Sequence, residues 1–185
     1  PVRLARGGEV NDELMRIFVR NSRFPETSRG DMRALMAAVR LSERRLEELV
    51  ARYGNARLQA IFDDLIARTR DAVRARFREL VPVGTYHFTD TVDSDGHGHD
   101  NIKLRWRLDV SPTRVVLDGR DSDDQMPGPV NYLMSLTEPA LTFGSFLLAG
   151  RRDVSMNAGA EGLFDEVLVR EGSILQPKFP GALGQ

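Results

Sequence analysis

The chain has 185 residues, which is enough for one domain with a hydrophobic core, with or without a helical appendage. Its 26 basic and 27 acidic residues give a net charge of −1, which argues against nucleic-acid binding, because that class usually carries a basic excess. Cysteine is absent, which excludes disulfides, cysteine-ligated zinc, iron–sulfur clusters and a thiol nucleophile.

Nothing in the hydropathy pattern directs the chain to a membrane or to export. No apolar run reaches the roughly 18 residues that a membrane span needs. The N-terminal segment Pro-Val-Arg-Leu-Ala-Arg lacks the apolar core of a signal peptide. We therefore expect a cytoplasmic location.

The first half of the sequence has the pattern of helices. Asn11 is a favourable N-cap, and Asp12 and Glu13 follow it in the first turn, where the helix dipole stabilises negative charge. We expect this short helix segment to be closed by Pro25. Two long amphipathic helices are predicted after it, over about residues 30–53 and 56–80.

The two long helices are separated by Gly54 and Asn55, which supply a helix stop and a cap. Because this connection is so short, we expect the helices to fold back as an antiparallel hairpin. In the first of them, apolar residues recur at intervals typical of one helix face. These residues are Leu35, Val39, Leu46, Val50 and Tyr53.

The second half has the pattern of strands. From Thr85 the apolar period changes to two, which predicts strands near residues 85–92, 102–110 and 115–117, joined by short turns as an antiparallel meander. A helix is predicted over about residues 131–149 and a last strand over 164–169. The predicted class is α+β: a long antiparallel helical hairpin and a small antiparallel sheet with a covering helix.

We assign residues 1–81 to the helical region and residues 82–185 to the sheet region, within one compact unit. Neither region contains a Gly-x-Ser-x-Gly elbow or a phosphate-binding P-loop. The sequence therefore offers no standard motif for nucleophilic catalysis or nucleotide binding.

One cluster combines residue types that bind metals. In an extended loop His97 and His99 would point to the same side, and Asp95 could complete a shell for zinc or another transition metal. The same composition is typical of a solvated turn, and glycine on both sides of His97 would hold ligands poorly. We favour the turn, and a metal site at Asp95, His97 and His99 is the alternative.

A second polar cluster lies at the start of the first long helix. Arg29 and Arg33 are four residues apart, with Asp31 between them, so two guanidinium groups could clamp a carboxylate. The alternative is a helix start whose arginines pair with neighbouring acids. Spacing alone favours the alternative.

Several short segments, taken in order, resemble the B-type subunits of the hydantoinase, 5-oxoprolinase and acetone carboxylase family. They are spread over nearly the whole chain. The segments are Arg29–Ala34, Glu43–Leu49, Pro82–Tyr86, Gly128–Asn131, Asn157–Gly159 and Glu171–Pro177. The residues Val39-Arg40-Leu41-Ser42 depart from the family pattern, and this leaves the substrate class open.

The resemblance implies an assembly of two kinds of subunit. ATP and Mg²⁺ are held in an A-type subunit, which phosphorylates a cyclic amide, such as a lactam or hydantoin, or a ketone. The B-type subunit then completes a hydrolysis or a carboxylation. A divalent metal is held in an N-terminal stretch of the relatives that nothing in this sequence matches, so the resemblance implies no cofactor in this chain.

The chain is therefore expected to be an internal fragment of a B-type subunit, inactive alone, with a structural and subunit-contact role in a hetero- or homo-oligomer. The residues implied as inward-facing polar groups that organise the core or the contact are Arg29, Asp31, Arg33 and Asn131. The alternative function is a non-enzymatic interaction module in which the helical hairpin presents a surface to a partner. An apolar stripe left exposed would favour that alternative.

Overall fold

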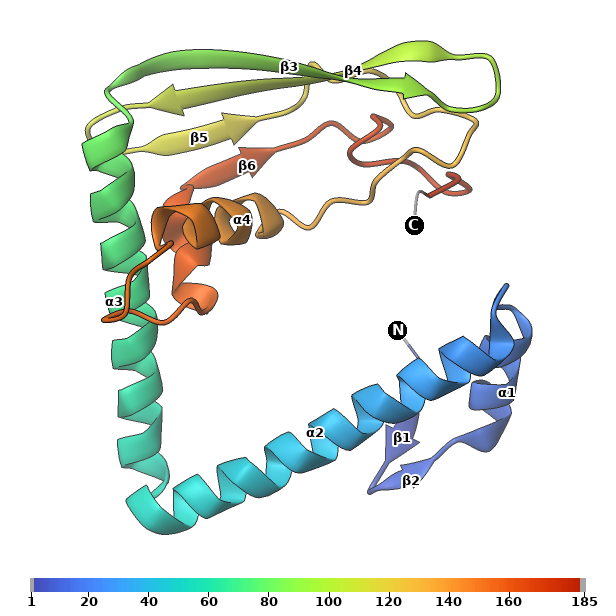
Figure 1. Ribbon diagram of the computed structural model, residues 1–185, viewed down its shortest axis with the longest axis vertical. Coiled ribbons are helices and arrows are strands. Elements are labelled where there is room, and N and C mark those ends of the chain that lie inside the picture. The colour runs from blue at the N-terminus through green and yellow to red at the C-terminus, as the bar shows by residue number, and fades with distance from the viewer. Residues whose placement is uncertain (1, 184–185) are drawn as a thin grey trace. The chain divides into compact units, whose positions relative to one another are not determined.

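The computed structural model describes residues 2–183. The chain forms two compact units, unit 1 (Pro1–Ala60) and unit 2 (Ile61–Gln185). None of the described helices is long and apolar enough to cross a membrane. The elements of both units are labelled in Figure 1.

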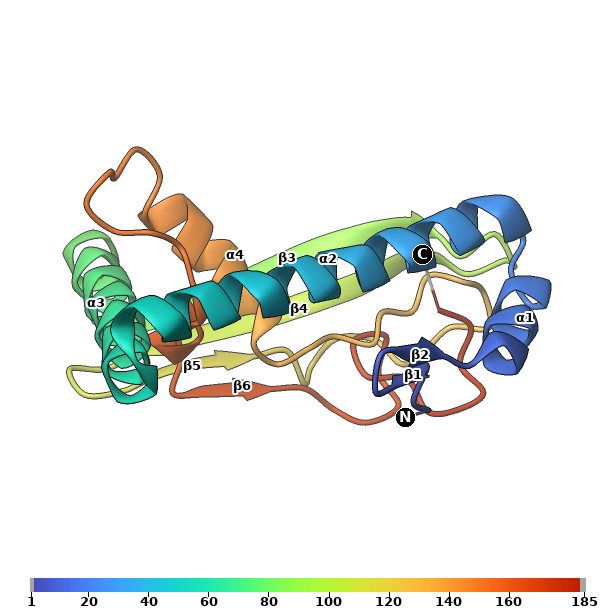
Figure 2. The same cartoon turned by 90° about the horizontal axis from the view of Figure 1, so that it is seen from below.

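Unit 1 is mostly helical. Two short strands, β1 (Ala5–Arg6) and β2 (Glu9–Val10), pair antiparallel and are followed by α1 (Asp12–Arg20) and α2 (Pro25–Tyr53). The predicted cap is confirmed, because the Asn11 side chain accepts a hydrogen bond of 3.0 Å from the backbone N–H of Leu14. Met15 and Val19 are the buried residues of α1, which packs against α2 (Figure 2).

The expectation that Pro25 closes the first helical segment is wrong. The helix α1 already ends at Arg20, and Pro25 instead begins α2. The physical reason is that proline lacks a backbone N–H, and the first turn of a helix leaves its N–H groups without helical partners in any case.

The two long helices and the break between them are confirmed. α2 ends at Tyr53, Gly54 follows with a φ of 76°, and α3 covers Asn55–Leu80. A positive φ is available to glycine without steric cost. The boundary between the units falls within α3, at Ala60, so the antiparallel packing of α2 on α3 stays a prediction.

Unit 2 is built on a four-stranded sheet. Its strands, in spatial order, are β3 (Gly84–Ser94), β4 (Asp100–Val110), β5 (Val115–Asp118) and β6 (Glu166–Leu168). The first three pair antiparallel as predicted. The predicted class, α+β, is confirmed.

The expectation of a wholly antiparallel sheet is wrong for the last strand, because β6 pairs parallel with β5. Between them the chain runs through α4 (Glu138–Leu147) and the 3₁₀ helix η1 (Ala158–Leu163). Such a crossover returns the chain to the end of the sheet at which β5 began, as a parallel pair requires. Both helices lie on one face of the sheet (Figure 1).

The predicted helix over residues 131–149 is shorter than expected, because α4 begins only at Glu138. The preceding residues are held in a loop by distant backbone carbonyls. The N–H of Tyr132 donates to Ile174 O at 2.8 Å, and the N–H of Met134 donates to Leu175 O at 3.2 Å. These bonds compete with the first helical turn that the sequence pattern indicated.

The main core of unit 2 lies between the sheet, α3, α4 and η1. Its buried residues are Val73, Phe77, Val110, Val115, Leu117, Ala140, Leu148, Ala160, Leu163 and Phe164. A smaller buried cluster joins β4 to the C-terminal segment through Ile102, Ile174 and Leu175. Trp106 packs against both clusters, so the sheet and helices of unit 2 share one continuous apolar interior.

Candidate functional site

The three charged residues that the sequence singles out at the start of α2 are not buried. Asp31 and Arg33 are exposed and do not contribute to the core of the described residues, and their role at a subunit contact stays a prediction. Arg29 is half-exposed, with Nε 3.9 Å from Glu26 Oε2 one turn earlier. The reason is the helical period, because the more buried side of α2 here passes through Ser28, Met32 and Met36.

Asn131, in contrast, is fully buried in unit 2 and joins two segments of the chain. Its Oδ1 accepts a hydrogen bond of 2.7 Å from the N–H of Met126. Its Nδ2 donates to the carbonyls of Met126 at 2.7 Å, Gly128 at 3.2 Å and Ala182 at 2.7 Å. One side chain thus closes the loop before α4 and ties it to the C-terminal segment.

Asp95 makes a second connection to the same loop. Its carboxylate accepts hydrogen bonds from the backbone N–H groups of His97 at 2.7 Å, His99 at 3.1 Å and Gly128 at 3.3 Å. Its Oδ2 also lies 2.9 Å from His99 Nδ1. Asp95 is 3% exposed, and it fixes the β3–β4 turn and links that turn to Gly128.

Gly128 leaves no room for a side chain. A Cβ at this position would lie 2.2 Å from the carbonyl oxygen of Asp95. We call Asp95, His99, Gly128 and Asn131 the loop junction. The loop junction brings together two groups that the sequence singles out separately, the Asp-His turn and the Gly-Pro-Val-Asn segment.

In the described residues, the histidines of the turn are not grouped with two further ligand side chains. Within residues 2–183, no three His, Cys, Asp or Glu side chains are grouped in a way that could hold a metal ion. Asp95 already accepts the hydrogen bonds described above, and His97 and His99 are exposed. Metal binding by Asp95, His97 and His99 stays a prediction, which metal analysis of tag-free protein would test.

The loop junction should make the stability of the fold depend on pH in the acidic range. Burial raises the pKa of Asp95, but the N–H donors of His97, His99 and Gly128, with the His99 imidazole, outweigh it and lower the pKa from 3.8 to about 2. A carboxylate with a lowered pKa stabilises the fold fully above its unfolded-state pKa, and that contribution is lost as the pH falls through its folded-state pKa.

We therefore expect the contribution of Asp95 to be complete above pH 3.8 and to disappear as the pH falls towards 2. Urea unfolding of the chain and of Asp95→Asn between pH 2 and pH 6 measures it. The two free energies should converge at the acid end. Asp118, Asp123, Asp153 and Asp165 also have lowered pKa values, so the difference between the two proteins isolates Asp95. A difference that is constant with pH would contradict the assignment.

A further polar cluster attaches η1 to α3. The Nδ2 of Asn157 donates to Thr69 Oγ1 at 2.7 Å, and its Oδ1 accepts from the N–H of Gly159 at 2.8 Å. The Thr69 hydroxyl donates to the carbonyl of Ser155 at 3.0 Å. Thr69 is 1% exposed and was missed from the sequence. The spacing in the sequence could have revealed it. Thr69 lies four residues after Leu65 and four before Val73, which places its hydroxyl on the apolar side of α3.

The apolar stripe of α2 remains uncovered within unit 1. None of the α2 residues is buried, and the exposed fractions are 62% for Leu35, 68% for Val39, 45% for Leu46 and 39% for Val50. These four residues, which we call the α2 stripe, lie on one helix face by their spacing. Exposed apolar surface of this extent is typical of an interaction site.

Comparison with known proteins relates the chain to one family over its whole length. The family model described as Hydantoinase B/oxoprolinase matches residues 1–185. The chain is 29% identical over 186 residues to a putative B-type D-/L-hydantoinase subunit from Pseudomonas sp. (strain NS671), covering 94% of this chain and 31% of that protein. It is 28% identical over 110 residues to the beta subunit of caprolactamase from Pseudomonas jessenii, covering 60% of this chain and 19% of that protein.

An uncharacterized protein of Methanocaldococcus jannaschii is 20% identical over 180 residues, covering 97% of this chain and 31% of that protein. Among solved structures, the ATP-dependent caprolactamase from Pseudomonas jessenii has the same fold over 100% of this chain and 31% of its own, with a TM-score of 0.73 and 22% identity. The chain spans about a third or less of the length of the relatives that it matches.

Proposed function

Because the chain belongs to the hydantoinase B/oxoprolinase family, we propose that it is one portion of the B-type subunit of an ATP-dependent amidohydrolase. The chain acts as a scaffold and contacts a partner subunit, and it is inactive without the remainder of the assembly. The reaction that we propose for the assembly is the ATP-coupled opening of a cyclic amide such as a lactam or hydantoin. The caprolactamase and hydantoinase names of the relatives favour hydrolysis over the carboxylation of a ketone.

The α2 stripe is the observation that carries the contact role. Burying an apolar side chain of this size is worth about 1.5–3 kcal/mol relative to leaving it in water. Four such side chains in a row therefore offer a partner substantial binding energy. Glu43 and Glu47 border the groove that Val39, Leu46 and Val50 form, so the fitting partner surface is apolar with basic residues at its edge.

The partner that we propose is an A-type subunit, which supplies ATP and Mg²⁺, in a hetero-oligomer. The divalent metal belongs to another part of the B-type subunit. Arg29, Asp31 and Arg33 lie at the start of α2, where they would form part of the polar rim of this contact. The dependence on ATP supports a cytoplasmic location.

A charge placed in the α2 stripe tests the contact. In the complete B-type subunit, Val39→Asp should weaken the affinity for the A-type partner about a hundredfold, because a carboxylate would be buried among apolar groups. Ala37→Asp is the matched control, since Ala37 is exposed and lies about half a turn away on α2. Calorimetric titration measures both affinities, and turnover should fall with the loss of assembly.

Two results would count against the contact. The first is binding and turnover that are the same for Val39→Asp and Ala37→Asp. The second is a large loss of stability of the free B-type subunit in Val39→Asp, since this would place the stripe inside the subunit. A lowered affinity with unchanged stability of the free subunit supports the proposal.

The exposed stripe also favours the alternative of a non-enzymatic interaction module. The two proposals differ in what the completed assembly does. The amidohydrolase role requires that the assembly open a cyclic amide with consumption of ATP, and that Val39→Asp reduce this activity. Assembly without any such turnover would favour the interaction module.

A further inference from the structure

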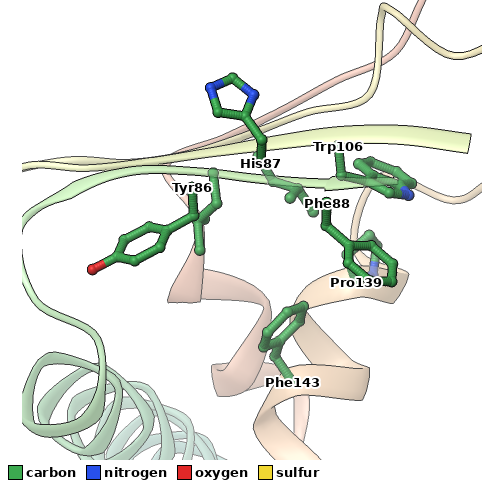
Figure 3. A pocket seen from close by; sticks show the side chains of 8 residues that line it. Tyr86, His87, Phe88, Trp106, Pro139 and Phe143 are labelled. Carbon is green, nitrogen blue, oxygen red and sulfur yellow. The ribbon is translucent and has the colours of Figure 1, made fainter. Parts of the chain in front are cut away.

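An apolar cavity of about 370 Å³ lies in unit 2 between the sheet and α4. Strand alternation places Tyr86 and Phe88 of β3 on the cavity side, with Leu108 and Trp106 of β4 as their direct cross-strand partners. Phe143 of α4 forms the opposite wall. Figure 3 shows the side chains of Phe88 and Phe143 facing this space, whereas the imidazole of His87 lies on the other side of the sheet.

The walls are held in place by contacts outside the cavity. The ring of Phe143 packs edge-on against Phe164, with centroids 5.5 Å apart. The hydroxyl of Tyr86 donates to the carbonyl of Pro82 at 2.8 Å. Trp106 lies directly over Gly119, where a Cβ would approach Cζ3 of the indole to 2.6 Å. The cavity is therefore formed before any ligand arrives.

The polarity of the lining side chains indicates what kind of ligand the cavity can bind. The lining side chains are mostly carbon, and the Tyr86 hydroxyl already has a backbone partner. The other polar groups are the Trp106 indole N–H and the His87 imidazole, which points to the other side of the sheet. A lactam or hydantoin ring would lose its hydrogen bonds with water here without replacement, so the cavity does not fit the substrate of the proposed reaction. An apolar ring has no such hydrogen bonds to lose on entry.

The size of the cavity also fits a small molecule. Pockets for small ligands range from roughly 300 to 1,000 Å³, and an apolar cavity of about 150 Å³ is enough to bind benzene. Phe88, which is 63% exposed, and Tyr86, which is 39% exposed, lie partly in solvent. A polar substituent on the ligand could remain in water beside them.

We propose that this cavity is a binding site for small molecules that insert a compact apolar ring, aromatic or alicyclic, between the sheet and α4. The site does not depend on the proposed amidohydrolase role. Its ligands are compounds with one compact apolar ring and a polar group that stays outside.

The sequence provides a reporter for this site, because Trp106 is the only tryptophan in the chain. The probe is 4-bromobenzyl alcohol, whose bromine quenches tryptophan fluorescence on contact. We expect saturable quenching by one molecule per chain, reversed by benzyl alcohol, which carries no bromine. Leu108→Phe should fill the cavity and weaken binding by about tenfold or more.

Phe143→Ala provides a second variant, because Phe143 is 40% exposed and its loss removes one wall. It should also weaken binding. Thr89→Ala is the matched control, because Thr89 lies on the opposite side of β3 from Phe88 and does not line the cavity, and it should bind as the original chain does. Quenching that rises linearly without saturation would overturn the proposal, as would saturation that neither Leu108→Phe nor Phe143→Ala alters. Binding by this chain but not by the complete B-type subunit would also overturn it.

Discussion

Replacing Asn131 with alanine is expected to lower the free energy of unfolding of the chain by about 3–5 kcal/mol. The physical reason is that its fully buried amide satisfies four backbone groups at once. After the substitution, the N–H of Met126 and the carbonyls of Met126, Gly128 and Ala182 lose that partner. Each buried group left without a partner costs about 1–3 kcal/mol. A water molecule that enters the space and forms a hydrogen bond would recover part of this cost. Urea unfolding followed by circular dichroism measures the loss.

A comparison with Asn21→Ala separates burial from the loss of an amide. Asn21 donates one bond of 2.8 Å to the carbonyl of Ile17 at an exposed position, so its removal should cost less than about 1 kcal/mol. Asn131→Asp keeps the shape but presents an oxygen to three carbonyls, and it should be at least as destabilising as alanine. Equal small losses for all three variants would show that the loop junction does not hold unit 2 together.

A methyl group at Gly159 should have a comparable effect through steric contact. A Cβ at this position would lie 2.1 Å from the carbonyl oxygen of Ile66 and 2.9 Å from the N of Arg70. Both are backbone atoms of α3, so neither can move without moving the helix. We expect Gly159→Ala to cost about 3 kcal/mol or more, because overpacking against rigid backbone is poorly relieved.

The matched control is Gly30→Ala. Gly30 lies within α2, where a Cβ would meet nothing within 4 Å. Alanine is favoured over glycine inside a helix by about 0.5–1 kcal/mol, so this variant should stabilise the chain. Thermal unfolding of both variants by calorimetry gives the comparison. A Gly159→Ala protein as stable as the original would contradict the close approach of η1 to α3.

The sequence patterns that predicted the fold well are those set by neighbouring residues. The glycine stop at Gly54 and the cap at Asn11 act within one helical turn, and both are confirmed. The alternation over residues 102–110 predicted β4 closely, because one side of that strand contacts the core along its length. Local chemistry alone decides such features.

The features that the sequence did not predict depend on residues far apart in the chain. The parallel pairing of β6 depends on a crossover of two helices. The late start of α4 depends on carbonyls of Ile174 and Leu175. The role of Asn131 in tying its loop to the C-terminal segment depends on Ala182, 51 residues later. No pattern of local spacing contains this information.

In the candidate site, too, the sequence predicted local features but not the contacts between distant residues. The family segments Gly128–Asn131 and Asn157–Gly159 were recognised from the sequence, but their contacts with Asp95 and Thr69 could not be. Spacing alone favoured ordinary ion pairs for the arginines of α2, and the contact of Arg29 with Glu26 agrees with that. Within the described residues, these two family segments hold loops and helices together through Gly128, Asn131 and Asn157, which is consistent with a scaffold.

We propose that these 185 residues support an ATP-dependent amidohydrolase without containing its catalytic centre. The most direct test is an assay of the chain alone with ATP, Mg²⁺ and caprolactam, hydantoin or 5-oxoproline, with the complete A- and B-type assembly as the positive control. We predict no ring-opened product from the chain and no substrate-dependent release of phosphate. Sustained turnover of any of these cyclic amides by the chain alone would contradict the claim.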